Sequence, residues 1–193
     1  MGFALSGSLL SVPIHFSTHF SGIGCAEQAV SLVAEAYRSC AFAEKSETAL
    51  SRSSPSLKCV SCCEINVACQ KVLAGQAEHV FMDIEAAFPT IQVQATDSLE
   101  KKWKAVRAAL APQSLRRCAT HFLCRQPLIS LDVSGSPCQP WSRAGRGKGM
   151  ADSRSLLLLM WAALMLQLKP AIAVHENVVG FDTSVLQDWD VRE

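Results

Sequence analysis

An open α/β fold, with a mostly parallel sheet and helices on both faces, is the fold class that the sequence predicts. Strand-like and helix-like segments alternate along the chain, glycine or proline separates several of them, and 193 residues correspond to one ordinary domain. Hydrophobic residues make up 49% and charged residues 18%, a composition that excludes a disordered chain. The net charge of +1 indicates no general affinity for nucleic acid, so such binding requires a local patch.

Hydrophobic periodicity and turn residues define the individual elements. The predicted strands are residues 13–20, 57–63, 79–84, 128–133 and 171–174, and the predicted helices are 25–38, 65–73, 98–110 and 155–168. Helix 98–110 carries Leu99, Trp103, Val106 and Leu110 on one face with charges opposite, and Pro112 stops it, while the serine-rich stretch 46–56 predicts a loop. The apolar run 156–166 is shorter than the roughly 20 residues of a membrane span, so we predict a buried helix and no membrane partner.

Cysteine usage and the N-terminal residues bear on compartment and metals. The nine cysteines are an odd number in apolar segments, which favours reduced thiols in an intracellular protein. Residues 1–13 contain no Lys or Arg, so we expect no targeting signal. Two groups could be imagined as zinc ligands, but a 55-residue gap separates them and we expect no metal site: Cys59, Cys62 and Cys63, and Cys118, His121 and Cys124.

Chemically distinctive residues directly follow the five predicted strands. They are the turn 20–24, Glu64, Asp83, Pro137 with Cys138, and Glu176 with Asn177. Ligands of open parallel sheets bind beyond the carboxyl ends of the strands, and those ends share one edge. We therefore expect one rim to collect two glycines, three carboxylates and a thiol.

The first three of these sites suit an adenosine-bearing ligand. Gly22 and Gly24 form a G-x-G turn before a helix, Glu64 is suited to the hydroxyls of a ribose, and Asp83 could accept a hydrogen bond from an adenine amino group. A plain tight turn, helix caps or solvated charges are the alternatives. The turn lacks a third glycine and a Walker lysine, which favours S-adenosylmethionine over dinucleotides and ATP.

Residues 134–181 carry the most informative motifs of the chain. Pro137-Cys138-Gln139 is followed by Pro140-Trp141-Ser142, then by Asp152, Arg154 and Leu157 or the neighbouring Leu156, and later by Glu176-Asn177-Val178. In order and spacing these motifs resemble those of the DNA (cytosine-5) methyltransferases. Upstream, the turn 20–24, Glu64 and Asp83-Ile84 resemble the cofactor motifs of the same family, so the resemblance spans about residues 15–181.

The resemblance implies a Rossmann-like S-adenosylmethionine-dependent methyltransferase fold, an enzyme acting on DNA, and a nuclear location if the source is eukaryotic. The cofactor-binding residues that it implies are Phe20, Ser21, Gly22, Ile23, Gly24, Glu64, Ile65, Asp83 and Ile84.

Methylation at carbon 5 of cytosine explains why a thiol and a carboxyl group are needed. A thiolate that adds to carbon 6 makes carbon 5 nucleophilic, and Cys138 is expected to be that nucleophile. Glu176 is expected to supply the acid at N3 of the base. The catalytic residues that the resemblance implies are Cys138, Glu176, Pro137, Gln139, Asn177 and Arg154. An inert core cysteine is the alternative for Cys138.

The segment after this motif alternates cations with glycines. The residues expected to contact nucleic acid are Ser142, Arg143, Arg146 and Lys148, on a loop that would close over the substrate. A solvated flexible loop is the alternative.

Residues 180–193 contain none of the family's later motifs, namely the Gln-x-Arg-x-Arg strand, the target recognition domain and the Gly-Asn segment. We therefore expect residues 15–193 to form a partial catalytic domain, incomplete at its C-terminus, after a segment 1–14. Its activity alone is expected to be low or absent, with a second polypeptide as a potential partner. The alternatives are an inactive remnant that binds S-adenosylmethionine or a partner protein, and a cytosine-5 RNA methyltransferase.

Overall fold

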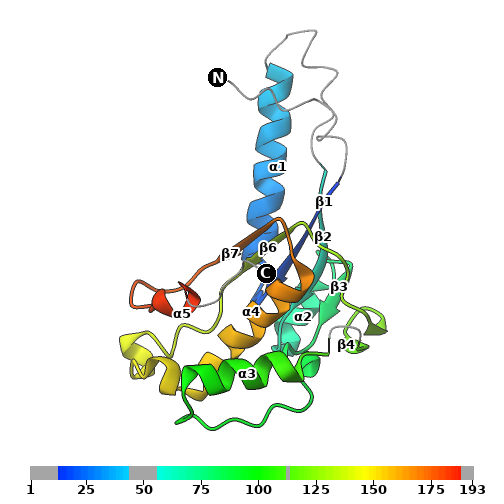
Figure 1. Cartoon of the computed structure of the whole chain (residues 1–193). Coiled ribbons are helices and arrows are strands. Elements are labelled where there is room, and N and C mark those ends of the chain that lie inside the picture. Colours follow the sequence, from blue (N-terminus) through cyan, green and yellow to red (C-terminus); the bar gives the residue numbers. More distant parts are fainter. Residues whose placement is uncertain (1–12, 44–55, 112–113, 188–193) are drawn as a thin grey trace, which may run out of the picture.

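The computed structural model describes residues 13–43, 56–111 and 114–187. Its centre is a sheet of seven strands in the order β5-β4-β3-β2-β1-β6-β7 (Figure 1). The strands are β1 (Ile14–His19), β2 (Leu57–Cys63), β3 (His79–Phe81), β4 (Arg116–Cys118), β5 (Phe122–Cys124), β6 (Leu131–Ser134) and β7 (Ile172–His175). Pairing is parallel from β3 through β2, β1 and β6 to β7, which confirms the predicted open, mostly parallel α/β fold.

Helices connect the parallel strands. They are α1 (Cys25–Ala43), α2 (Val67–Leu73), α3 (Leu99–Ala109), α4 (Leu156–Leu168) and α5 (Ser184–Gln187), with short 3-10 helices η1 (Glu85–Ala87), η2 (Arg143–Gly145), η3 (Gly149–Ala151) and η4 (Ser153–Ser155). Asn66 and Ser98 cap α2 and α3 through their side chains, which explains why both helices begin one or two residues after the predicted starts. The predicted loop 46–56 lies almost wholly, and Pro112 entirely, outside the described residues.

The sequence prediction missed the hairpin formed by β4 and β5. These strands have three residues each and pair antiparallel, with Arg116 opposite Cys124 and Cys118 opposite Phe122. The hairpin joins the sheet through the pairing of Phe81 on β3 with Cys118. Phe122 and Leu123 are exposed, so no alternation of buried and exposed apolar residues marks this edge in the sequence.

Two hydrophobic cores lie on opposite faces of the sheet. Neighbouring residues of a strand point to opposite faces, so Phe81 joins one core and Val80 the other. The larger core contains residues of α3 and α4, and the smaller one contains Leu73 of α2 with Val30 of α1 packed against it. Figure 1 shows α4 in front of the strands and α3 below them, with α1 extending beyond the sheet.

Helix α4 is the apolar centre of the larger core. Its residues 158–165 are all buried, as the sequence predicts for this run. Among the described residues no single helix is long and apolar enough to span a membrane, although one pair, residues 143–151 with 153–168, bent by 65°, meets the length and composition requirement together.

One charge of α3 does not face solvent as predicted. The Lys102 side chain is buried, and its Nζ donates hydrogen bonds to the carbonyl oxygens of Ala95 (2.7 Å) and Met150 (2.6 Å). Burial lowers the pKa of Lys102. The ammonium group thus joins α3 to the segment that follows the Pro-Cys-Gln motif, a role that periodicity alone cannot reveal.

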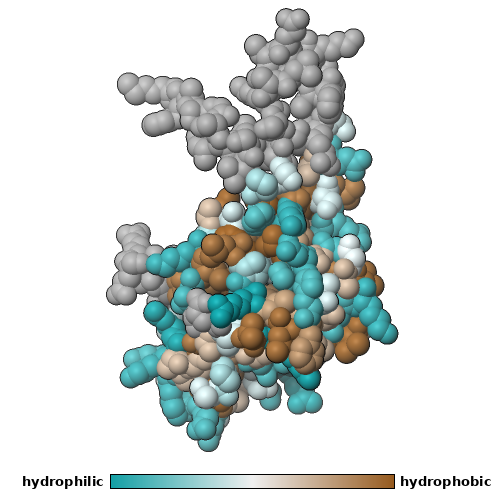
Figure 2. All heavy atoms as spheres, turned by 90° about the vertical axis from the view of Figure 1, so that its right-hand side faces the viewer, coloured by the Kyte–Doolittle hydropathy of each residue, from teal (hydrophilic) through white to brown (hydrophobic). Residues whose placement is uncertain are grey.

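The face of the molecule in Figure 2 is mainly polar, with separate apolar areas between the polar ones. Exposed apolar side chains occur along the chain rather than in one element, among them Leu32, Ile65, Phe122, Leu128 and Ile172.

Candidate active site

The strand order brings the predicted site residues to one rim. Asp83, Glu64 and the turn 20–24 follow the carboxyl ends of β3, β2 and β1, which are neighbours in the sheet. Cys138 and Glu176 follow β6 and β7 on the other side of β1. The connection after β1 leads to β2, and the connection after β6 leads to β7 in the opposite direction, so the switch point where ligands of such sheets bind lies between β1 and β6.

The turn after β1 is held to β2 by main-chain contacts. The Phe20 amide donates to the Cys63 carbonyl (2.9 Å), and the Gly24 amide donates to the Ser21 carbonyl (3.0 Å). Phe20, Gly22 and Gly24 all have positive φ, at 58°, 56° and 87°. Glycine is the residue that adopts this conformation without strain, which explains the G-x-G spacing.

Glu64 links this turn to the start of α2. Its Oε2 accepts a hydrogen bond from the Gly22 amide and its Oε1 one from the Asn66 amide, both at 2.8 Å. A carboxylate has about four acceptor positions, so two remain for a ligand. The space where Gly22 would carry a Cβ holds no atom within 4 Å. The Glu64 carboxylate and the backbone at Gly22 are therefore both accessible to a ligand.

The remaining predicted cofactor residues differ in exposure. Ile23 and Ile65 are 61% and 72% exposed and flank Gly22 and Glu64 as apolar surface. Asp83 Oδ1 accepts a hydrogen bond from the amide of Glu85 (2.8 Å), the first residue of η1. Ile84 is buried in the larger core, and its side chain faces away from the rim. Phe20 is partly buried against the same core.

A buried polar network underlies the rim between β1 and β6. Asp132 is fully buried and accepts hydrogen bonds from Ser17 Oγ (2.5 Å), Ser134 Oγ (2.6 Å) and Trp161 Nε1 (2.8 Å). His19 Nδ1 lies 3.0 Å from its Oδ2. Burial raises the pKa of Asp132, but His19 and the hydroxyl donors outweigh that effect, so its pKa is lowered overall.

This network joins the two strands that precede the glycine turn and the Pro-Cys-Gln motif. Sequence reasoning missed it because an aspartate in a strand is usually exposed. An acidic residue flanked by apolar ones in the predicted strand 128–133 is the signal that could have found it.

A second network joins the Pro-Cys-Gln segment to the Glu-Asn-Val segment. Buried Ser136 precedes Pro137, and its Oγ lies 3.0 Å from His175 Nε2 and accepts a hydrogen bond from Asn177 Nδ2 (3.1 Å). The Asn177 amide also donates to the Ser136 carbonyl (3.2 Å). Burial lowers the pKa of His175, with Asp132 acting in the opposite direction. Residues on both sides of Glu176 are thereby tied to the residue two positions before Cys138.

Between them, the Glu176 amide donates to the Ser134 carbonyl (2.8 Å), which continues the pairing of β6 with β7. A Cβ on Gly135 would lie 3.0 Å from Glu176 Oε2, so this carboxyl group rests over the backbone that leads to Cys138. Glu176 is exposed and Cys138 is partly exposed, as residues that meet a substrate must be.

The loop after Cys138 folds back on the motif. The Trp141 and Ser142 amides both donate to the Cys138 carbonyl (2.9 Å), Pro140 is fully buried, and the Gly149 amide donates to the Pro140 carbonyl (2.7 Å). A Cβ on Gly145 would lie 1.8 Å from the Gln139 carbonyl oxygen, so only glycine permits this approach. The backbone of this turn is therefore held in place around the thiol.

The cations of this loop remain at the surface. Arg143, Arg146 and Lys148 are exposed, and Ser142 Oγ accepts from the Gly145 amide (3.1 Å) as the cap of η2. Arg146 and Gly147 have positive φ.

Arg154 is paired rather than free. Its Nε and one terminal nitrogen donate to the two oxygens of Asp152, at 2.8 and 2.6 Å. These bonds bring the pKa of Asp152 to about 2 and raise that of Arg154, with a smaller contribution to Arg154 from Cys138. The thiol therefore lies within electrostatic range of the guanidinium.

A cavity of about 620 Å³ adjoins the same segment. Gln139, Arg146, Lys148, Asp152 and Arg154 are among its lining residues. A larger cavity of about 730 Å³ lies elsewhere, between α1, β2 and the end of α2, and its lining contains none of the predicted site residues. Buried Glu27 lines that cavity, and its Oε2 has no hydrogen-bond partner among the described residues. Chemistry rather than size therefore identifies the candidate site.

Comparison with known proteins finds a family similarity for the part of the chain that contains Cys138 and Glu176. Residues 122–187 match the family model described as C-5 cytosine-specific DNA methylase. We call residues 122–187, which are similar to this family, the methylase segment. It contains both the Pro-Cys-Gln and the Glu-Asn-Val motifs with the strands that carry them, β6 and β7.

The chain is also similar to curated bacterial and phage methyltransferases. The chain is 41% identical over 54 residues to the orphan methyltransferase M.SPRI of Bacillus phage SPR, which is 28% of this chain and 12% of the relative. It is 40% identical over 52 residues to type II methyltransferase M.AquIA of Picosynechococcus (27% and 21%), and 41% identical over 51 residues to M.HaeII of Haemophilus aegyptius (26% and 16%). The chain thus spans about a fifth or less of the length of these relatives.

The methylase segment begins after the turn 20–24, Glu64 and Asp83. For these upstream residues the assignment as cofactor ligands stays a prediction, and their support is their position on the rim beside the methylase segment.

Proposed function

We propose that this chain transfers a methyl group from S-adenosylmethionine to carbon 5 of cytosine in DNA. The observation that carries the proposal is the junction of two motifs through Ser136. Its hydroxyl contacts His175 and Asn177, which flank Glu176, and it precedes Pro137-Cys138 directly. A nucleophile and an acid for one cytosine ring must lie on a common, fixed support, and this junction supplies it.

The residues on the β1–β3 side of the rim fit S-adenosylmethionine. Glu64 keeps acceptor positions that suit a ribose diol, and the open space over Gly22 admits a ligand close to the backbone. The exposed side chains of Ile23 and Ile65 offer apolar contact to an adenine ring. When bound there, S-adenosylmethionine supplies an electrophilic methyl group.

The residues on the β6–β7 side act on the base. Cys138 in its thiolate form would bond to carbon 6 of cytosine, and the displaced electron pair would move to carbon 5. Carbon 5 would then take the methyl group of S-adenosylmethionine, whose sulfur–methyl bond breaks to leave S-adenosylhomocysteine. Glu176 donates a proton or a hydrogen bond at N3 and so favours the attack. Loss of the carbon 5 proton to water leaves an electron pair that restores the carbon 5–carbon 6 double bond, so the sulfur–carbon bond breaks and Cys138 returns to its thiolate form.

Access to cytosine in a duplex requires that the nucleotide leave the stack. Arg143, Arg146 and Lys148 are exposed beside the cavity next to Gln139 and are suited to phosphate contacts. The base would then enter from the side on which the thiol and Glu176 are exposed.

Methyl transfer is tested under single-turnover conditions, with protein in excess over a cytosine-containing DNA duplex and labelled S-adenosylmethionine. We expect slow formation of 5-methylcytosine, measured by mass spectrometry of the digested nucleosides. Cys138→Ser should abolish the product, whereas Cys69→Ser, which replaces a half-buried cysteine on α2, should leave it unchanged.

Product of equal yield in Cys138→Ser and in the wild type would refute the proposal. A matched RNA duplex is assayed in parallel. Methylation of RNA alone would show that the substrate is RNA rather than DNA, with the same reaction mechanism. Binding of S-adenosylmethionine without product would favour a binding protein instead.

A further inference from the structure

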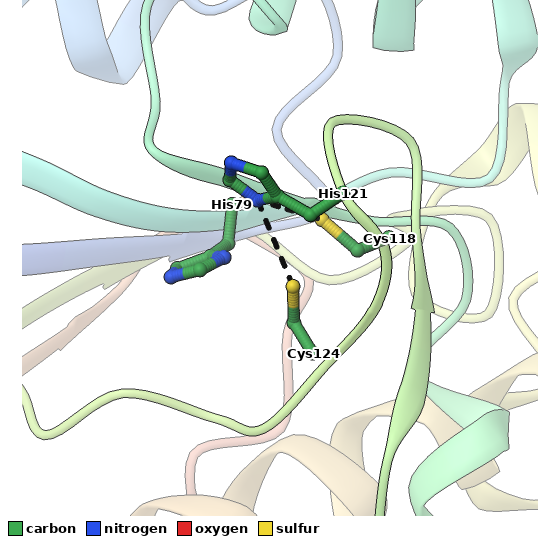
Figure 3. A group of neighbouring side chains, drawn as sticks. All are labelled: His79, Cys118, His121 and Cys124. Carbon is green, nitrogen blue, oxygen red and sulfur yellow. Dashed lines mark hydrogen bonds between the residues drawn. The ribbon is translucent and has the colours of Figure 1, made fainter.

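Four metal-binding side chains meet at the edge of the sheet opposite to β7. His79 begins β3, Cys118 ends β4, His121 lies in the turn of the hairpin, and Cys124 ends β5. One ligand atom from each lies within 4.8 Å of the others. Figure 3 shows the side chain of His79, from β3, close to those of Cys118, His121 and Cys124, which come from the hairpin. We call these four residues the His/Cys cluster.

Backbone contacts hold the hairpin turn against β3. The Ala119 amide donates to the Val80 carbonyl (2.8 Å), and the Val80 amide donates to Thr120 Oγ1 (3.2 Å). In the antiparallel pairing of β4 with β5, Cys124 lies opposite Arg116, which is two residues before Cys118, so both cysteines are on the same face of the hairpin. The cluster is therefore a product of strand pairing and does not depend on one flexible side chain.

The distances are close to those of a tetrahedral site. His121 Nδ1 lies 3.7 Å from Cys124 Sγ and 4.0 Å from Cys118 Sγ. Zinc bonds of about 2.3 Å to sulfur and about 2.0 Å to nitrogen put neighbouring ligand atoms roughly 3.3 to 3.8 Å apart. Small side-chain movements would thus complete the geometry.

His79 has a nitrogen without a partner. Its Nδ1 is buried and has no hydrogen-bond partner among the described residues, although a buried ring nitrogen normally has one. Its other nitrogen, Nε2, lies 3.8 Å from the Glu78 carboxylate. Metal-binding histidines commonly use one nitrogen for the metal and direct the other to a carboxylate, and His79 has this arrangement.

We propose that His79, Cys118, His121 and Cys124 bind one divalent transition metal ion, best matched by zinc. Two thiolates and two imidazoles form the Cys₂His₂ set that zinc favours, and the two thiol protons pass to solvent as the ion binds. Four protein ligands leave no open position, so the ion is structural. It joins the β4–β5 hairpin to β3, where Phe81 and Cys118 form the ladder pair.

This proposal revises the expectation of no metal site. Sequence reasoning tested Cys118, His121 and Cys124 together with Cys59, Cys62 and Cys63, whereas the fourth ligand is His79, 39 residues before Cys118. The cluster is also separate from the candidate active site, because His79 is at the start of β3 and Asp83 follows its other end.

Cobalt is a direct probe of such a site. The full chain is reduced, freed of metal and titrated with Co²⁺, whose thiolate charge-transfer and tetrahedral d–d absorption report the ligands. We expect one Co²⁺ per chain, displaced by Zn²⁺. His121→Asn and Cys124→Ser should weaken binding at least tenfold, whereas the matched controls His15→Asn and Cys69→Ser should leave it unchanged. His121 is exposed, so its replacement preserves the fold, which circular dichroism checks.

Thermal unfolding provides the second measurement. Zn²⁺ should raise the melting temperature of the wild type and of both controls, and a chelator should reverse the shift, while His121→Asn should show none. Failure to bind near one ion per chain would overturn the proposal. Equal binding by His121→Asn and the wild type would also overturn it, because the metal would then be bound by other residues. A Cys118–Cys124 disulfide that persists under reducing conditions would overturn it as well.

Discussion

The two halves of the rim are built in different ways. In the nucleoside half, formed by the turn 20–24, Glu64 and Asp83, both carboxylates bind backbone amides of short loops, at Gly22, Asn66 and Glu85. In the base half, formed by Cys138 and Glu176, the support comes from side chains about 40 residues apart, through Ser136, His175 and Asn177.

This difference has a functional consequence. The nucleoside half depends mainly on contacts within its own loops and the neighbouring strand, whereas the base half depends on β6 and β7 staying paired. Changes in one half should therefore leave the other intact, because sites without shared partners usually behave additively. The buried Asp132 network, which touches β1 and β6 together, is where the halves meet.

Among substitutions that leave Cys138 in place, replacing Glu176 should have the largest effect on the rate of methyl transfer. Glu176→Gln keeps the size of the side chain and removes its proton, and general acid catalysis typically contributes about 100-fold to 10,000-fold. We expect single-turnover methyl transfer to slow by that factor while the affinity for S-adenosylmethionine stays within about twofold. Glu100→Gln on α3 is the control. A matching loss of cofactor affinity would contradict the independence of the halves.

Replacing the carboxylate of the nucleoside half should weaken cofactor binding. Hydrogen bonds to a charged group contribute about 1.5 to 3 kcal/mol, so Glu64→Ala should raise the dissociation constant for S-adenosylmethionine by about 10-fold to 150-fold in calorimetry. Glu64→Gln separates the loss of charge from the loss of the contacts to Gly22 and Asn66. Equal affinities for the wild type and Glu64→Ala would remove Glu64 from the site.

Ser136→Ala tests whether the hydrogen bonds of Ser136 to His175 and Asn177 position the thiol of Cys138. This change deprives His175 and Asn177 of a buried partner, which costs about 1 to 3 kcal/mol of unfolding free energy. We expect denaturant unfolding to show this loss and methyl transfer to slow, with cofactor affinity retained. Ser153→Ala, at an exposed position, is the control, and unchanged transfer in Ser136→Ala would show that the junction does not position the thiol.

The smallest expected effect is that of the Asp152–Arg154 ion pair on the stability of the fold. Arg154 holds the pKa of Asp152 at about 2, below its ordinary 3.8, so the pair stabilises the fold above about pH 4 and this contribution is lost as the pH falls towards 2. Urea unfolding of the wild type and Asp152→Asn should differ near neutral pH and converge at acid pH. A difference that stays constant down to pH 2 would show that the charge of Asp152 is not involved.

The parallel strands were predictable because each is bounded by turn residues and followed by a helix. Strand β2 matches its predicted range, residues 57–63, and β1 lies within residues 13–20. The hairpin β4–β5 was missed because three-residue strands with exposed Phe122 and Leu123 have no periodic signal.

The site was predictable to the extent that its motifs are contiguous. Cys138 and Glu176 stand in short motifs, and the order of the strands brings them to one rim. Asp132, His175 and Ser136 gain their roles only from partners far away in the chain. The same is true of Lys102, whose charge is satisfied by two carbonyl groups, and of His79, which strand pairing brings to the cysteines. Such contacts depend on tertiary structure and have no local signature.

The most direct test of the central claim is to trap the cysteine on its base. An oligonucleotide with 5-fluorocytosine blocks the final elimination, so a thiolate that has added to carbon 6 stays bound. With S-adenosylmethionine present, we expect a slow covalent adduct, which peptide mass spectrometry maps to Cys138, unchanged in Cys69→Ser and absent in Cys138→Ser. An adduct on another cysteine, an equal yield in Cys138→Ser, or no adduct from a wild-type sample that binds S-adenosylmethionine would contradict the account.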